Sequence, residues 1–459
     1  MPALAQTRLP PLALALATGA AAATVGAAAV LDPQLALAAI AGLVFAAVAF
    51  SNLALGVAAF AALSFFERVS TGAGEAVSLA KLTGIILIVA ALRKSGAPLL
   101  TREHPVLGVT AVVLVAWAAA SAVWAGQPGA ALAEAAGLAF GVAVAFVVFA
   151  AARTLRDVRV IVWAYVAGAV ASALVGFAQL SAGGQVGDAI DAGADANRLA
   201  GGVGDPNELA AFLLPALALA AFGLAAHRGL GARWLLIVAL MVIVPALFLT
   251  QSRGGLLALA MMLVLGIALA GPVRAQVLAL ALAVGALGLG LYAVAAPPET
   301  RGRLANIAAG GGTGRVDLWS IAKEVALDHP LAGVGSGNFR FVEPLYSAES
   351  IALPNVELIV DRPRVVHNTF LEILAELGVT GALLFGLLIS GTLAVGVRAW
   401  GSLRDRGDVT HELLTRALVV GTIGMLISFV FISGQAKEQL WIVLGLLLRL
   451  GSLSLARAE

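Results

Sequence analysis

The chain has 459 residues, of which 61% are hydrophobic and 12% are charged, and its formal net charge is +2. Soluble globular proteins carry about 25% charged residues, so this composition excludes an ordinary soluble domain and indicates a membrane protein. Cysteine is absent, which excludes disulfides, thiol catalysis and cysteine-based metal sites. The net charge is too small to indicate an acidic partner by itself, so the positions of the basic residues matter more than their sum.

Apolar stretches of about 20 residues, long enough to cross a bilayer, recur along the sequence. Fourteen spans are predicted, near 10–31, 35–49, 53–66, 78–93, 105–124, 129–151, 158–180, 207–226, 233–250, 253–271, 274–296, 378–399, 413–432 and 438–452. Twelve spans is the alternative if the short segments within 35–66 do not both cross. The first span follows Arg8 and is interpreted as a retained helix, because further apolar segments follow it at once.

The positions of lysine and arginine in short loops predict the orientation. With fourteen spans the basic loop residues all fall on one side: Arg93, Lys94, Arg102, Arg153, Arg156, Arg159, Arg228, Arg233, Arg274, Arg398, Arg404 and Arg406. Both termini are therefore expected in the cytoplasm. The predicted fold class is an all-α polytopic membrane protein with about 12–14 transmembrane helices and one long extracytoplasmic, partly helical loop.

Three organisational units are predicted: a transmembrane bundle over 1–296, an extracytoplasmic loop domain over 297–377, and C-terminal transmembrane helices over 378–459. Within the loop domain, 316–326 mixes apolar and charged residues in a way that suits a helix on or near the membrane surface. Glycines at 333, 335 and 337 then end it. A second short helix is expected over 367–377, leading directly into a span.

Two arginines stand out on the extracytoplasmic side. Arg253 lies in a tight turn between two apolar runs, where a charge costs about 2.5–3.5 kcal/mol at membrane depth. Its simpler interpretation is an arginine that snorkels to lipid phosphates, but Gly254 and Gly255 permit a ligand to approach the backbone closely. Arg315 follows Thr313, which can cap a helix whose N-terminus would favour anions; the alternative is a solvated loop arginine. Together the two guanidinium groups suit a di-anion such as pyrophosphate.

His367 is the candidate general base. The chain has five histidines; the other four are His104, His227 and His411, predicted on the cytoplasmic side, and His329 in the outer segment. His367 is best placed beside the two arginines, and an imidazole there can take a proton from an attacking hydroxyl. The structural alternative is an interfacial histidine near a helix start. Asn368 is expected to orient the histidine or to bind a sugar hydroxyl.

The remaining motifs narrow the chemistry. Residues 201–208 open a span, and Asp205-Pro206-Asn207 is typical of a helix start, so a plain turn and cap is the alternative to a ligand-binding role. No HExxH motif, clustered metal ligands or Walker loop occurs, and nothing predicts a nucleic-acid partner.

Several short motifs, in their order along 201–381, resemble the O-antigen ligase and O-antigen polymerase superfamily of bacterial envelope glycan enzymes. They are Gly204-Asp205-Pro206-Asn207-Glu208-Leu209-Ala210, Ser252-Arg253-Gly254-Gly255, Gly314-Arg315 with Trp319, Asp328-His329-Pro330-Leu331-Ala332-Gly333-Val334-Gly335-Ser336-Gly337-Asn338-Phe339, His367-Asn368-Thr369-Phe370-Leu371, and Glu376-Leu377-Gly378 with Gly381. Each motif is short, and their order, with a long outer loop that ends in His-Asn, carries the resemblance.

The resemblance implies a glycosyltransferase of polysaccharide or lipopolysaccharide biosynthesis in the inner membrane, similar in fold to multi-spanning lipid-dependent glycosyltransferases. Arg253 and Arg315 would hold the pyrophosphate of an undecaprenyl-linked glycan donor, and His367 would activate the acceptor hydroxyl without a metal or cofactor. The acceptor would be a glycan, lipid or protein in the cell envelope. The expected substrate-binding residues are Asn368, Asn207, Ser252, Gly254 and Asn338.

Alternatives remain at this point. A glycan polymerase of the same superfamily carries the same motifs, so the sequence does not separate it from a ligase. A transporter of a small anion should show an inverted repeat or paired broken helices with polar residues near mid-membrane. Neither feature is found, and the polar groups gather on one side. A non-catalytic envelope protein is the third alternative.

Overall fold

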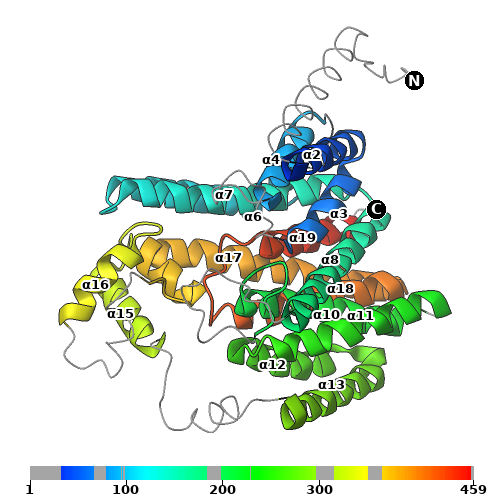
Figure 1. Ribbon diagram of the computed structural model, residues 1–459. Coiled ribbons are helices and arrows are strands. Elements are labelled where there is room, and N and C mark those ends of the chain that lie inside the picture. Colours follow the sequence, from blue (N-terminus) through cyan, green and yellow to red (C-terminus); the bar gives the residue numbers. More distant parts are fainter. Residues whose placement is uncertain are drawn as a thin grey trace, which may run out of the picture.

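The computed structural model describes residues 33–66, 79–94, 96, 99–182, 198–227, 229–295, 315–349 and 364–455. Over these ranges the regular structure is entirely helical (Figure 1). Nine of the described helices are long and apolar enough to cross a membrane. The predicted all-α polytopic class is therefore confirmed, while the predicted first span, 10–31, lies outside the described residues.

The helices follow the predicted spans closely. They are α2 (Pro33–Ser51), α3 (Leu53–Leu63), α4 (Leu79–Leu92), α5 (Leu100–Glu103), α6 (Pro105–Ala120), α7 (Pro128–Ala151), α8 (Leu155–Ser181), α10 (Pro206–Ala226), α11 (Leu230–Leu249), α12 (Arg253–Leu269), α13 (Arg274–Ala295), α15 (Arg315–Asp328), α16 (Phe339–Glu349), α17 (Thr369–Asp405), α18 (Val409–Ser428) and α19 (Glu438–Leu455). Short 3-10 turns extend α6 at Ser121–Val123 and precede α13 at Gly271–Val273. Helix α15 confirms the helix predicted over 316–326, whereas α16 was not predicted.

The centre of the bundle is formed by α10, α18 and α19. In the most apolar stretch of each helix, 78% of the residues of α10, 78% of those of α18 and 83% of those of α19 are buried. The corresponding share for α13, which lies at the edge of the bundle, is 22%. Close contact between α10 and α18 depends on Gly421, where a Cβ would lie 2.6 Å from the Cα of Pro215. Helices from the first and third predicted units thus pack directly on each other, and the proposed unit boundaries stay a prediction.

Helix α3 bears on the number of spans. It has 11 residues, which corresponds to a rise of about 16 Å. That is roughly half of the hydrocarbon thickness, so α3 alone does not cross. Asn52 separates it from α2 and caps it, since its Oδ1 accepts a hydrogen bond of 3.2 Å from the backbone N–H of Leu55. A separate crossing at 53–66, which the count of fourteen spans requires, is therefore not supported.

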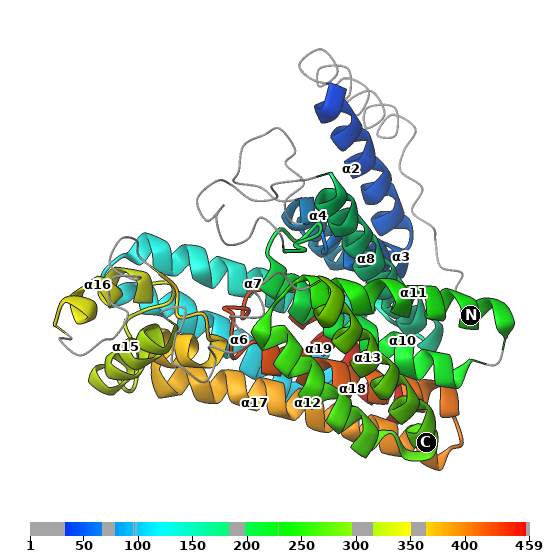
Figure 2. The same cartoon turned by 60° about the horizontal axis from the view of Figure 1, so that its bottom comes forward.

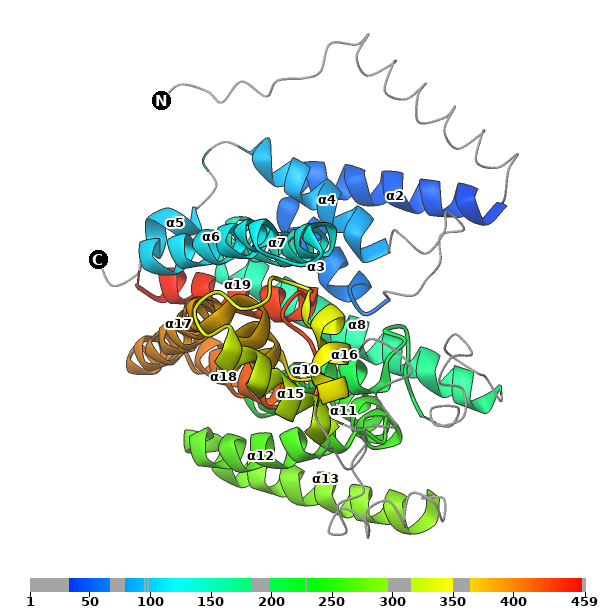
Figure 3. The same ribbon diagram turned by 90° about the vertical axis from the view of Figure 1, so that its left-hand side faces the viewer.

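The helix connections sort onto two ends of the bundle. We call the end with the turns 121–127, 198–205, 250–252 and 429–437 the loop face, and the end with 93–104, 152–154, 227–229, 270–273 and 406–408 the basic face. Helices α15 and α16 lie beyond the loop face in two views (Figures 1 and 2). Figure 3 looks onto that end and shows the two helices lying across it between α7 and α12. Which face is cytoplasmic stays a prediction.

Helix α17 is broken in a way that anchors the loop segment. Gly378 has φ 66 and ψ −171, so the short helix predicted before residue 378 and the span predicted after it are confirmed as two pieces. The break frees the carbonyls of the preceding turn, which must find other donors because buried backbone groups are almost always paired. The Nε1 of Trp117 donates one such bond to the carbonyl of Leu377 at 3.0 Å.

The glycine-rich loop after α15 supplies the remaining partners. The backbone N–H groups of Val334 and Gly335 donate to the carbonyls of Ala375 and Glu376 at 3.0 and 2.8 Å, and Val379 N–H donates to the carbonyl of Pro330 at 2.8 Å. The loop can follow this path because its glycines at 333, 335 and 337 have φ 66, 100 and 64. We call this set of backbone hydrogen bonds the α17 lock.

Replacing Gly378 by alanine should destabilise the protein. A Cβ there would lie 2.3 Å from the carbonyl carbon of Leu331, and the strained backbone alone costs about 1–3 kcal/mol. The matched control is Gly386→Ala in the same helix, where a Cβ meets nothing within 4 Å. Thermal unfolding of the purified variants in detergent should show a lower Tm for Gly378→Ala only; equal Tm values would contradict the proposed role of the lock.

Candidate functional site

Helices α10, α12, α15 and α17 all begin at the loop face. Asp205 caps α10, accepting from the backbone N–H groups of Asn207 and Glu208 at 2.7 and 3.0 Å. Ser252 caps α12 and Asn368 caps α17 in the same manner. A helix N-terminus carries about half a positive charge and exposes backbone N–H donors. The loop face is therefore suited to an anion before any charged side chain is considered.

The starts of α10 and α12 are held together by packing and by Arg198. At Gly255 a Cβ would lie 2.6 Å from the Cβ of Ala210, so the two helix starts are in contact. The guanidinium of Arg198 donates to the carbonyl of Thr250 and to the Oδ1 of Asn207, each at 2.9 Å. Asn207 is thus tied to the turn that carries Arg253, and its Oδ1 is engaged within the protein.

Packing also connects the start of α12 to α15. At Gly254 a Cβ would lie 2.6 Å from the side chain of Phe431, whose ring lies 6.0 Å from that of Trp319. Trp319 and Arg315 are four residues apart and share one side of α15. The Nε1 of Trp319 is buried and has no hydrogen-bond partner among the described residues. It is an unused donor beside the contact between Trp319 and Phe431.

His367 lies within electrostatic reach of Arg315. The pKa of His367 is lowered to about 4, first by burial and then by the positive charge of Arg315, while Asp205 opposes the shift and Arg364 adds to it. The imidazole is therefore neutral at neutral pH and able to accept a proton. The charges that act on this imidazole come from Asp205 next to α10, Arg315 at the start of α15 and Arg364 shortly before α17.

The backbone at the site is strained. Among the residues described, Gln251 and His367 are the non-glycine residues with positive φ, at 50 and 52. Each comes directly before the cap of a site helix, at Ser252 and Asn368. Such conformations cost on the order of 1–3 kcal/mol and concentrate at functional sites, so their placement favours a functional role for both turns.

The start of α17 is held by the segment 429–437. Thr369 Oγ1 donates to the carbonyl of Ile432 at 2.8 Å and accepts from the N–H of Gly434 at 2.8 Å. One turn later, Glu372 accepts hydrogen bonds from Ser433 and, at 2.8 Å, from the side chain of Gln435. These bonds fix the position and direction of the helix that presents His367.

Arg253, by contrast, is exposed. Its guanidinium makes no hydrogen bond within the described ranges, so it is available to a ligand. The start of α12, which carries Arg253, is joined to the site by the packing of Gly254 on Phe431 and of Gly255 on Ala210, whereas the charge of Arg315 acts on His367. The structure thus places Arg253, Arg315 and His367 at one face of the bundle, and the charge of Arg315 lowers the pKa of His367.

Asn338 has a different environment from the one expected. Its side chain is 1% exposed, its Oδ1 accepts from the N–H of Gln127 at 2.8 Å, and its Nδ2 donates to the carbonyl of Ser336 at 2.9 Å. The amide joins the loop to the start of α7, and these contacts do not support a substrate-binding role. Ser252 and Asn368 likewise use their side-chain oxygens as helix caps.

Sequence reasoning did not assign roles to Arg198, Arg364 and Asp205. Arg364 stands three residues before His367, but nothing local shows that its charge acts on the imidazole. Asp205 was interpreted as part of a turn and cap, which it is; its proximity to His367 arises from the fold. The positive charges at the site, from Arg253, Arg315 and Arg364, exceed the negative charge of Asp205.

The protein is a polytopic α-helical membrane protein with capped helix starts and positively charged side chains at one face of its bundle. A family profile described as O-antigen ligase matches residues 236–386, about a third of the chain. The match includes Arg253, Arg315 and His367 and supports the assignment of the chain to the O-antigen ligase superfamily. No curated protein matches the chain.

Charge substitutions should move the pKa of His367 in opposite directions. Arg315→Gln removes a positive charge that lowers this pKa, so the pKa should rise; Asp205→Asn removes a charge that raises it, so the pKa should fall. NMR of histidine-labelled protein in detergent, assigned with His367→Gln, measures both. A shift in the same direction for the two variants would contradict the geometry, and Arg340→Gln, an exposed arginine of α16, is the control.

Proposed function

We propose that the protein transfers a glycan from a lipid-linked pyrophosphate donor to an acceptor hydroxyl, at the loop face, which is then extracytoplasmic. The observation that carries the proposal is the grouping of Arg315, Arg364 and the helix starts around one neutral imidazole. The family match supports a glycosyltransferase-like enzyme. The pyrophosphate of an undecaprenyl-type donor is a di-anion, which the excess of positive charge from Arg253, Arg315 and Arg364 over Asp205 would attract.

Arg253 and Arg315 bind the pyrophosphate from two sides in this proposal. Paired guanidinium hydrogen bonds match phosphate geometry, and the helix N-termini add fixed donors. As the bond between the anomeric carbon and the pyrophosphate oxygen breaks, its electron pair leaves with the diphosphate. The added negative charge makes these contacts stronger in the transition state than in the ground state, which is the condition for catalysis.

His367 takes the proton from the acceptor hydroxyl as the acceptor oxygen forms its bond to the anomeric carbon. Attack opposite the leaving group inverts that centre. The resulting imidazolium then passes its proton to solvent. Asp205 acts as a positioning residue, since its carboxylate favours the protonated imidazole.

Donor binding should also raise the basicity of His367. The charge of Arg315 that lowers the pKa of the imidazole is the charge that the diphosphate neutralises. A histidine with a pKa of about 4 is a weak base in the free protein, and general bases work best when their pKa lies near the operating pH. His367 therefore becomes a stronger base once the donor is bound. Proton transfer is thus limited to the complex with the donor.

Arg253→Ala and Arg315→Ala should each lower transfer by about 10²–10³-fold, because each removes a group that stabilises the leaving diphosphate. His367→Ala should lower kcat by roughly 10²–10⁴-fold with little change in donor affinity. Transfer is measured in vesicles with a lipid-pyrophosphate glycan, and donor binding separately. Arg340→Ala and His329→Ala, both exposed on the outer segment, are the matched controls. Full activity of either site arginine variant would refute the pyrophosphate assignment.

The pH profiles should differ between free and loaded enzyme. Since His367 must be neutral to accept a proton, kcat/KM should fall as the pH drops through about 4. Its pKa is higher in the donor complex, so kcat should fall at a higher pH than kcat/KM. Coincident profiles, with the protein folded throughout the range, would show that donor binding does not change the basicity of His367.

The products of the same assay distinguish a ligase from a polymerase of the superfamily. A ligase moves the glycan to an acceptor that is not the carrier, whereas a polymerase lengthens the glycan on its carrier. Uptake of a small anion by the same vesicles, without any glycan transfer, would instead favour a transporter.

A further inference from the structure

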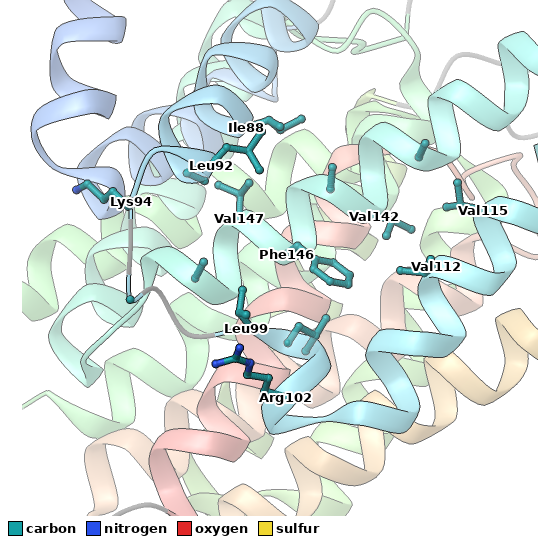
Figure 4. Close-up of a pocket in the computed structure, with 16 residues that line it drawn as sticks. Ile88, Leu92, Lys94, Leu99, Arg102, Val112, Val115, Val142, Phe146 and Val147 are labelled. Atoms are coloured by element: carbon teal, nitrogen blue, oxygen red, sulfur yellow. The ribbon is translucent and has the colours of Figure 1, made fainter.

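A pocket separate from the candidate site opens on the side of the bundle near the basic face. It has a volume of about 640 Å³ and lies between α4, α6 and α7, with the connection from α4 to α5 at one end (Figure 4). Its wall is apolar apart from two basic residues, Lys94 and Arg102. Leu92 and Val112 at its edge are 82% and 51% exposed, so the pocket opens sideways, where lipid surrounds the bundle.

Small residues on one side of α7 make room for the pocket. Ala139, Ala143 and Ala150 all line it, and their spacing of four and seven residues puts them on one side of the helix. From Ala139 to Ala150 the helix rises about 16 Å. This is close to half of the roughly 30 Å of hydrocarbon in a bilayer. The pocket therefore matches the depth of one leaflet, and its apolar wall suits an acyl chain.

The two cations lie where a lipid headgroup would be. Figure 4 shows Lys94 and Arg102 toward one end of the pocket, with Val112 and Val115 toward the other. Neither cation is paired with a carboxylate of the described chain. Glu103, next to Arg102, is instead bonded to Arg449 at 2.8 Å. Two positive charges without a carboxylate partner among the described residues thus lie at the entrance of an apolar slot, which is the pocket described above.

We propose that this pocket binds an anionic phospholipid of the leaflet on the basic face, with an acyl chain in the slot and its phosphate on Lys94 and Arg102. A single surface arginine merely snorkels to any phosphate, whereas two cations at a slot of leaflet depth select a negative headgroup. Basic pockets between transmembrane helices are known to bind such headgroups. The function proposed above places the diphosphate of the glycan donor at the opposite face, so the exclusion of the donor as the occupant rests on that proposal.

Native mass spectrometry of the purified full chain tests the proposal with dioleoyl phosphatidylglycerol and dioleoyl phosphatidylcholine, which share their acyl chains. The wild type should bind the anionic lipid more tightly by ~30-fold, about fivefold from each cation. Lys94→Gln/Arg102→Gln should lose this preference and retain weak binding of both lipids. Ala143→Phe, which fills the slot, should lose both lipids.

Arg404→Gln/Arg406→Gln is the matched control, since it removes two exposed charges from the basic face outside the pocket. Its lipid preference and Tm should equal those of the wild type. Equal affinity of the wild type for the two lipids would overturn the proposal, as would a preference that survives in Lys94→Gln/Arg102→Gln or disappears in the control. Absence of any lipid adduct would also overturn it and would indicate that another part of the chain, or a second copy, covers the pocket.

Discussion

The break in α17 and the loop that completes its hydrogen bonds determine where the functional face can form. A transmembrane helix tolerates a break only if the freed backbone groups find partners, and here the partners come from the loop that follows α15. The carboxylate of Glu376 adds two more bonds, from the N–H groups of Gly337 and Phe339 at 2.6 and 3.2 Å. One set of main-chain contacts therefore joins a long extramembrane segment to the bundle in a single register.

The charges of the candidate site form a coupled system. Positive side chains and helix N-termini surround an imidazole that burial keeps neutral. Burial lowers the pKa of His367 most, and the positive charges of Arg315 and Arg364 that lower it further also favour a diphosphate at the site. In the proposed function, affinity for the donor and readiness for proton transfer then arise from one electrostatic arrangement.

Much of the architecture was predictable because helix length and charge placement are local properties. The spans and the helix at 315–328 follow from residues close together in the sequence, whereas the partners of the break at Gly378 come from the distant loop after α15. The environment of Asn338 was not predictable, since its amide pairs with Gln127, far away along the chain. The influence of Asp205 on His367 also depends on the packing of α10 against the rest of the bundle. A short motif identifies a residue type at the site, but only tertiary contacts reveal its partners.

The loop segment has a small core of its own, formed by Leu318, Ile321, Ala322, Val325, Val334, Phe339, Val366 and Ala375. Its outward side chains, such as Leu327 and Leu345 at 78% and 64% exposure, take no part in that core or in the α17 lock. Because the attachment uses main-chain groups and buried side chains such as Glu376 and Asn338, the exposed outer side chains can change without disturbing it. Related chains can thus evolve different recognition surfaces on an unchanged core, and substitutions confined to exposed positions such as Leu327 and Leu345 offer a direct way to engineer new selectivity.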